Sequence, residues 1–345
     1  MFFGGFIIFI ILMLAIDLGL FSKSDKPVSL KVAAIMSVIW VSFALGFGAI
    51  LYFWGNELHN VHDFGHLREI ISKHLHDVKI VENDLAASIQ AYNKALTLEY
   101  LTGYVVEYAL SIDNIFVMVL LFTSFGIPEK YYHKVLVWGI IGAILMRCIF
   151  IFIGAALIAK FGWILYVFGA FLVYTGVMMY INRNQEEEVD PQNHPVVKFA
   201  SKYFKVTHKL DSGKFFVVEN GVKYVTPLFL VLLVIEFTDL IFAVDSIPAI
   251  FSVTKDPYIV FFSNIFAVLG LRSMFFLLVN IIDKFHYLKV GLAFLLVFIG
   301  AKMLLHSYLK EWGFTTSHSL IIIVGILAIS VIASLMFPKK KDYTT

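Results

Sequence analysis

The sequence predicts an all-α polytopic membrane protein with about nine transmembrane helices. The chain of 345 residues is 60% hydrophobic, and only 15% of its residues are charged. A soluble protein of this length would carry about 25% charged residues. Apolar runs long enough to cross a bilayer recur along the chain, at about residues 2–21, 32–54, 98–123, 132–159, 161–181, 226–251, 257–282, 286–309 and 318–337.

Residues 1–54 are expected to form the first two transmembrane helices. The first run lacks a basic flank and a small-residue cleavage site, so we expect a retained helix and not a removable signal peptide. Residues 55–97 follow as an external polar stretch with five of the eleven histidines, in "ELHNVHDFGH" and "KHLHD". A metal-binding or sensing patch is one interpretation. The spacing fits no defined site, so a polar amphipathic loop is favoured.

The rest of the chain divides into four segments. Residues 98–181 are expected to hold three helices, and residues 226–309 three more. Between them, residues 182–225 contain an acidic linker and then "KFFVVENGVKYV", where Asn-Gly between alternating strands predicts a small β-hairpin. Residues 310–345 hold the last helix and a basic tail.

The distribution of basic residues predicts the orientation. With alternating loops assigned to the two sides, seventeen Lys and Arg residues fall on one side and seven on the other. The richer side is expected to be cytoplasmic. This places the N-terminus outside, and the C-terminus and residues 182–225 in the cytoplasm.

The two three-helix segments resemble each other. "EYALSIDNIF" (107–116) and "DLIFAVDSIP" (239–248) both place an aspartate six positions after an acid and follow it with a small polar residue and isoleucine. A glycine and an arginine come next in each copy, ending at Arg147 and Arg272, and then "GAFLVYTGVMM" and "GLAFLLVFIGAKM". Three spans are an odd number, so the second copy enters from the opposite side. Such inverted repeats are typical of secondary transporters.

Ionisable residues inside predicted spans are functional candidates by default, because they are costly in lipid. Mutual ion pairing is one explanation, and Arg147 and Arg272 are expected to be structural partners of acids. Buried ion pairs stabilise poorly compared with apolar packing, so a mirrored set of acids is better explained by a cation site. The predicted ligands are Glu107, Asp113, Asn114, Glu236, Asp239, Asp245 and Ser246, with charge partners Arg147, Arg272 and Lys302.

These ligands would converge only if their helices were not straight. Asp239 and Asp245 lie about 120° apart on a regular helix. Pro248 follows closely, so we expect the helix to open there, and the helix with Glu107 and Asp113 to break by symmetry. Oxygen ligands suit Mn²⁺, Ca²⁺ or Mg²⁺ and disfavour Cu⁺ or Zn²⁺.

The quoted segments resemble the TerC/Alx family of bacterial integral membrane proteins. The match includes "EYALSIDNIFV", "TPLFLVLLVIEFTDLIFAVDSIPAIF", "SNIFAVLGLRSMFF" and "FIGAKML", and covers about residues 98–309. The resemblance implies a transporter fold with acids on the transport path and an activity in manganese export. Calcium transport and tellurite resistance are further family associations. The family's motif positions correspond to Glu107, Asp113, Asn114, Glu236, Asp239, Asp245 and Ser246.

The expected function is therefore Mn²⁺ efflux by proton antiport, with Ca²⁺ as the alternative substrate. The sequence contains no GxxxxGK[ST] motif, so no ATPase site of that kind is expected. No permanently bound cofactor, no enzymatic activity and no nucleic-acid partner are expected. The expected partners are the divalent ion and the lipid bilayer. A rival interpretation is a tellurite-resistance scaffold that recruits cytoplasmic partners through residues 184–225.

Overall fold

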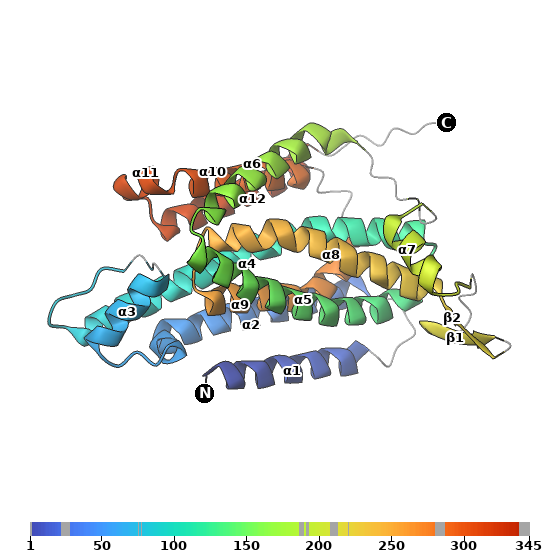
Figure 1. Ribbon diagram of the computed structural model, residues 1–345, viewed down its shortest axis with the longest axis horizontal. Coiled ribbons are helices and arrows are strands. Elements are labelled where there is room, and N and C mark those ends of the chain that lie inside the picture. The colour runs from blue at the N-terminus through green and yellow to red at the C-terminus, as the bar shows by residue number, and fades with distance from the viewer. Residues whose placement is uncertain are drawn as a thin grey trace.

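The computed structural model is a bundle of long helices with a small β-hairpin at one end (Figure 1). It describes residues 2–21, 28–74, 76, 78–185, 190, 193–207, 213–219, 221–279 and 287–337. Half of the predicted acidic linker (residues 186–189 and 191–192) and the basic tail at 338–345 lie outside the described residues. The long helices are α1 (Phe2–Phe21), α2 (Leu30–Trp54), α4 (Leu85–Ser124), α5 (Tyr132–Lys160), α6 (Ile164–Ile181), α8 (Pro227–Phe251), α9 (Pro257–Val279), α10 (Leu288–Leu304) and α12 (Thr316–Met336).

The all-α polytopic class is confirmed. Among the described residues, seven helices are long and apolar enough to cross a membrane, namely α2, α4, α5, α6, α8, α9 and α12. Helices α1 and α10 occupy the other two predicted apolar runs, and α10 has 17 residues. The count of nine spans therefore stays a prediction.

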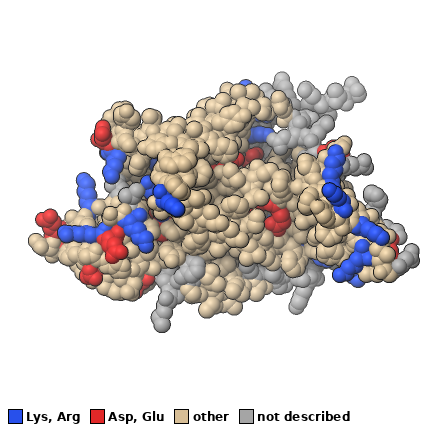
Figure 2. All heavy atoms as spheres, viewed as in Figure 1, with Lys and Arg blue, Asp and Glu red and all other residues tan. Residues whose placement is uncertain are grey.

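Charged side chains lie mostly at the two ends of the bundle. Figure 2 shows Lys, Arg, Asp and Glu gathered there, with a broad, mostly uncharged belt between them. The short helices α3 (Phe64–His74) and α11 (His306–Glu311) lie at one end, and α7 (Pro195–Tyr203) and the hairpin lie at the other (Figure 1). This separation is the one that a membrane-spanning bundle requires, because charges are costly in hydrocarbon.

Helix α4 begins well before the span predicted at 98–123. The carboxylate of Asp84 accepts a hydrogen bond from the backbone N–H of Ala87 at 2.9 Å and so caps the helix. Ser88, Tyr92 and Leu96 are buried at a spacing of four residues, so these initial turns of α4 pack along a single face. The external stretch 55–97 is thus partly an extension of the transmembrane helix.

The predicted helix openings are wrong. Helix α8 runs without interruption from Pro227 to Phe251, with Pro248 inside it, and α4 is also continuous. Pro248 lies in the last turn, where only a few residues remain to be held by the backbone ladder. The hydrogen bond that proline removes therefore weakens the end of the helix without opening its middle.

Helices α6 and α10 pack backbone against backbone through glycines. A Cβ atom on Gly176 would lie 2.7 Å from the carbonyl oxygen of Ala293, and one on Gly300 would lie 2.6 Å from that of Gly169. When 169–179 is aligned with 293–303, Gly169 corresponds to Ala293 and Gly176 to Gly300. Each contact then maps onto the other, as it would for two elements related by a two-fold axis. The inverted repeat itself stays a prediction.

The hairpin lies where the sequence predicts it. Strand β1 (Phe216–Glu219) pairs antiparallel with β2 (Val222–Val225), and Gly221 supplies the positive φ of the turn, +76°. The hydroxyl of Thr226 donates to the carbonyl of Lys214 at 2.7 Å, which ties the hairpin to the start of α8.

Candidate functional site

Four helices meet at the guanidinium of Arg147, which is fully buried on α5. Its Nη1 donates to the carboxylate of Glu107 on α4, and to Oδ1 of Asn264 on α9 at 3.1 Å. Its Nη2 and Nε donate to the carboxylate of Asp239 on α8, at 3.0 and 3.4 Å. We call Arg147, Glu107, Asp239 and Asn264 the Arg147 cluster.

The Arg147 cluster has capacity for a second positive charge. Two ionised carboxylates facing one guanidinium leave a net charge of −1 in a buried site, and an uncompensated buried charge is strongly destabilising. The Oε2 atom of Glu107 and the hydroxyl of Ser246 are buried without a hydrogen-bond partner. Such oxygens suit a proton or a hard cation.

A small cavity of about 20 Å³ reaches Asp239 and Arg272 between α4, α5, α8 and α9. This volume suffices for one water-sized particle. Arg272 is buried on α9, and its Nη1 donates to Nδ1 of His133 at 3.3 Å. The second predicted arginine therefore borders the same space as Asp239.

The other two acids of α8 point toward different helices. Glu236 is half-buried and packs its carboxylate against Gly142 of α5, where any Cβ atom would overlap it. It lies three residues before Asp239 and therefore one turn away on the same face. Asp245 is also half-buried and accepts a hydrogen bond from the hydroxyl of Thr175 on α6 at 3.3 Å.

The remaining predicted residues lie farther from Arg147. Asp113 is half-buried and Asn114 is buried. Asp113 follows Glu107 by six residues on the continuous α4, which is about 9 Å along the axis. Lys302 of α10 lines a separate cavity of about 660 Å³ with Lys255 and His306, toward the α3 end. The structure thus brings Glu107, Asp239 and Arg147 together and places Lys302 elsewhere.

Asn264 and Thr175 are the polar partners that the sequence did not single out. Asn264 is fully buried on α9 and Thr175 faces Asp245 from α6. Uncharged polar residues are common in membrane helices, so neither stands out by composition. Their contacts depend on how the helices are rotated, which hydropathy does not show.

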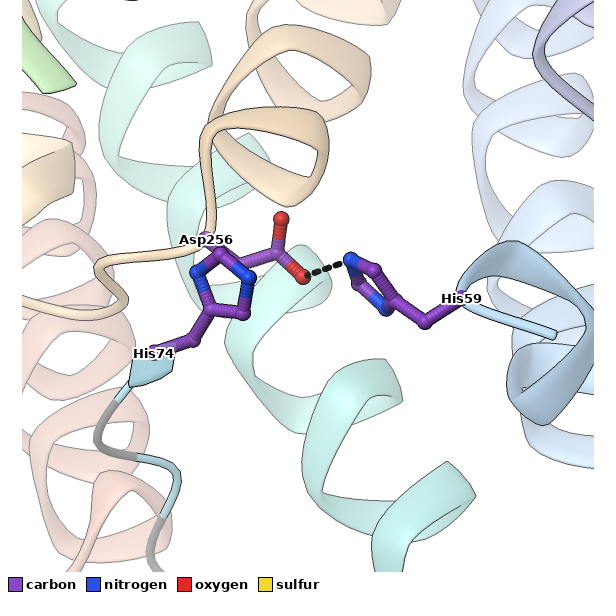
Figure 3. Close-up of side chains that lie close together, drawn as sticks. All are labelled: His59, His74 and Asp256. Atoms are coloured by element: carbon purple, nitrogen blue, oxygen red, sulfur yellow. Dashed lines mark ion pairs between the residues drawn. The ribbon is translucent and has the colours of Figure 1, made fainter. Parts of the chain in front are cut away.

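A second buried polar group lies at the α3 end of the bundle. One ligand atom each from His59, His74 and Asp256 lies within 4.8 Å of the others (Figure 3). Burial lowers the pKa of His59 to about 3 and that of His74 to about 4, and it raises the pKa of Asp256 to about 7. The favoured expectation of a merely polar loop overlooked this group, because Asp256 comes from the distant α8–α9 connection.

Comparison with known proteins identifies the family. Residues 92–342 match the model described as "Integral membrane protein TerC family". The chain belongs to the TerC family. The resemblance seen in the sequence is thereby confirmed, and the matched range contains the whole Arg147 cluster and Asp256 but neither His59 nor His74.

Relatives match the TerC family chain over nearly its full length. Membrane protein STKORF319 of Myxococcus xanthus is 43% identical over 333 residues, covering 96% of this chain and 91% of that protein. The "Putative membrane-bound redox modulator Alx" of Salmonella typhi is 40% identical and covers 98% and 95%. The protein of the same name in Escherichia coli (strain K12) is 41% identical and covers 95% and 92%. No solved structure matches the chain.

Proposed function

We propose that this TerC family protein exports a divalent metal ion, foremost Mn²⁺, through the Arg147 cluster in exchange for protons. The observation that carries the proposal is a pair of buried carboxylates, Glu107 and Asp239, that share one guanidinium. The unpartnered oxygens of Glu107 and Ser246 lie in the same region of α4 and α8 and offer further ligand positions.

The ligand chemistry supports Mn²⁺ and leaves Ca²⁺ as the alternative. The Arg147 cluster offers carboxylate and amide oxygens, and Ser246 adds a buried hydroxyl; hard divalent ions prefer such oxygen ligands. The outward direction and the preference for manganese rest on the TerC/Alx resemblance. Glu236 and Asp245 lie along α8 on either side of Asp239, and we assign them to the path of the ion.

Proton exchange supplies the driving force in this proposal. Expelling a dication against an inside-negative potential costs about 4.6 kcal/mol per 100 mV, twice the cost for a single charge. Because the sequence contains no GxxxxGK[ST] motif, we couple export to an ion gradient. A metal ion entering between Glu107 and Asp239 would displace the proton that neutralises their remaining negative charge when the site is empty.

The topology supports a bacterial cytoplasmic membrane with the N-terminus outside. The sequence assigns seventeen basic residues to the side that includes residues 182–225 and seven to the side that includes residues 55–97, which fits the positive-inside rule. The α3 end, with the His59–His74–Asp256 group, would then be the exit side.

The name of the Alx relatives refers to redox modulation. This chain has one cysteine, Cys148, which is half-buried on α5. An intrachain dithiol–disulfide couple needs two cysteines, so we propose no thiol chemistry for this protein.

The test is metal flux in proteoliposomes that contain the purified full chain. We expect Mn²⁺ flux to depend on an imposed pH gradient and to exceed that of Ca²⁺ and Mg²⁺. Asp239→Asn and Glu107→Gln should each lower the flux at least about tenfold, equivalent to about 1.4 kcal/mol. Glu69→Gln, an exposed acid on α3, is the matched control and should leave the flux unchanged.

The scaffold function predicts the opposite pattern. Deleting the hairpin would then abolish cellular resistance to the metal, while Asp239→Asn and Glu107→Gln would preserve it. Wild-type flux in both acid variants, with correct folding shown by size-exclusion chromatography, would overturn the transport proposal.

A further inference from the structure

Three metal-ligating side chains from distant regions of the chain converge at the α3 end. His59 follows the short helix η1 (Gly55–Leu58), His74 is the last residue of α3, and Asp256 directly precedes α9. Figure 3 shows the His59 and His74 rings on either side of the Asp256 carboxylate. Asp256 is fully buried and His74 is 8% exposed, so both side chains are largely shielded from bulk solvent.

The contacts around these groups leave their inner atoms free to bind a ligand. Nδ1 of His59 lies 2.9 Å from the hydroxyl of Tyr92, so the tautomer with a proton on Nδ1 leaves the lone pair of Nε2 facing inward. That Nε2 lies 3.3 Å from Oδ2 of Asp256. The other carboxylate oxygen, Oδ1, already accepts from the backbone N–H of Tyr258 at 2.9 Å.

The inner atoms are buried without hydrogen bonds. Neither Nε2 of His59 nor Oδ2 of Asp256 has a hydrogen-bond partner, despite the short distance between them. Each buried polar atom left without a partner costs about 1–3 kcal/mol. A cation between the two histidines and the carboxylate would give both of these atoms a partner.

We propose that His59, His74 and Asp256 bind one first-row divalent ion that prefers imidazole ligands, represented by Zn²⁺. A tetrahedral Zn²⁺ with bonds of about 2.1 Å separates its ligand atoms by about 3.4 Å. The distance from His59 Nε2 to Asp256 Oδ2 is close to this value. Two nitrogens and one oxygen also leave the fourth position open, as in catalytic or exchangeable zinc sites.

The surroundings hold the ligands in place. Tyr92 fixes the His59 ring, and residues of this outer kind orient metal-bound histidines. His76 lies beside the group, with Nδ1 donating to the Glu99 carboxylate at 2.9 Å and Nε2 3.8 Å from Oδ2 of Asp256. The hydroxyl of Thr254 donates to the same Glu99 at 2.5 Å. A proton on His76 is therefore the rival cation for this group.

The His59–His74–Asp256 group would prefer a different ion from the one that the Arg147 cluster prefers. Imidazole ligands suit Zn²⁺ and its neighbours, whereas the Arg147 cluster offers oxygen alone. The inference does not rest on the transport proposal, since binding at the α3 end can be measured without flux.

The test is a titration of the purified full chain in detergent, stripped of metal by a chelator, with Co²⁺ as a spectroscopic substitute for Zn²⁺. We expect one equivalent of Co²⁺ to give the visible absorption of a four-coordinate ion, which Zn²⁺ removes and an equal concentration of Mn²⁺ does not. His59→Gln and Asp256→Asn should lower the Co²⁺ affinity at least about a hundredfold. Tyr92→Phe, which keeps all three ligands, should lower it about tenfold.

Two controls keep the result specific. His62→Gln changes an exposed histidine of the same stretch, and Asp239→Asn changes the Arg147 cluster. Both should bind Co²⁺ like the wild-type protein, even if Asp239→Asn has lost all Mn²⁺ flux. The proposal is overturned if the wild-type protein gives no such spectrum, as expected when a proton on His76 is the only cation. It is also overturned if His59→Gln and Tyr92→Phe both bind with wild-type affinity.

Discussion

The Arg147 cluster and the His59–His74–Asp256 group are both buried, but only the first contains its own permanent cation. Arg147 compensates one of the two negative charges of Glu107 and Asp239, so an incoming ion meets about one remaining negative charge. At the α3 end, two neutral imidazoles and a carboxylate face one another, and Nε2 of His59 and Oδ2 of Asp256 have no hydrogen-bond partner.

This difference would allow one chain to hold the two kinds of metal site that we propose. A site that contains its own cation binds an incoming ion more weakly, which suits transport, because the ion must also leave. A site with unsatisfied nitrogen and oxygen atoms gains much more from an ion, which suits a resident or sensing metal.

The largest expected effect comes from removing the guanidinium of the Arg147 cluster. Arg147→Leu leaves Glu107 and Asp239 buried without a cation, so the free energy of unfolding in detergent should fall by about 3–5 kcal/mol. Adding Glu107→Gln and Asp239→Asn to Arg147→Leu should restore most of this loss. Arg183→Leu, at an exposed arginine, is the control. Equal stability of Arg147→Leu and Arg183→Leu would show that the guanidinium does not compensate the acids.

A matched pair of substitutions contrasts the two sites in metal-free protein. Asp239→Asn removes a charged acceptor from Arg147 and should lower the free energy of unfolding by about 1.5–3 kcal/mol. Asp256→Asn can keep the hydrogen bond from Tyr258 and removes a buried carboxylate, so its effect should be below about 1 kcal/mol. Chemical unfolding of both variants with a chelator present measures the contrast. Equal losses of unfolding free energy in the two variants would contradict the proposed difference between the two sites.

A substitution on α5 tests whether Glu236 lies on the proposed ion path together with the Arg147 cluster. Gly142→Ala places a methyl group where the Glu236 carboxylate lies, so the side chain must turn away, at a cost of about 1 kcal/mol. Mn²⁺ flux in proteoliposomes should fall if Glu236 lies on the ion path. Gly325→Ala on α12, where nothing lies within 4 Å, is the control and should change neither stability nor flux. Normal flux in Gly142→Ala would exclude Glu236 from the path.

The smallest expected effect concerns a histidine outside both sites. Nδ1 of His194 accepts the backbone N–H of Val196 and caps α7, and burial lowers the pKa of His194 below its ordinary value of 6.5. As the pH falls, His194 is therefore protonated in the unfolded chain before it is protonated in the folded protein. The contribution of His194 to stability is complete above pH 6.5 and is lost as the pH falls below that value.

Hydrogen exchange of the α7 amides measures this effect. Exchange should be faster, after correction for the intrinsic rate, at pH 5.5 than at pH 7.5. His194→Asn keeps a capping acceptor that does not titrate, so it should remove the pH dependence. If His194→Asn showed the same pH dependence of exchange as the wild-type protein, the titration of His194 would not be its cause.

The helices of this protein could be predicted from the sequence, but their rotations could not. Hydropathy located the long helices because a chain in lipid must satisfy its backbone hydrogen bonds within each segment. The expected cation site contained Glu107, Asp239 and Arg147, yet which acid meets which base depends on helix packing. The opening expected at Pro248 is wrong, because a proline in the last turn removes little of the helix ladder.

The His59–His74–Asp256 group could not be predicted from the spacing of residues in the sequence. The two histidines come from a stretch that the sequence showed as polar, and Asp256 comes from the connection between α8 and α9. Only the fold brings these segments together. A lone aspartate after "SVTK" carries no signal that it faces two imidazoles.

Helix α4 physically joins the two sites. Its 40 residues span about 60 Å, twice the thickness of the hydrocarbon layer, and it carries Glu107 of the Arg147 cluster and Glu99, the partner of His76. These two glutamates lie about 12 Å apart along one continuous helix. Because the helix is continuous, the distance between the two glutamates stays the same when α4 moves along its axis. Any axial movement of α4 that accompanies the passage of an ion is therefore transmitted in full to the residues beside the histidines.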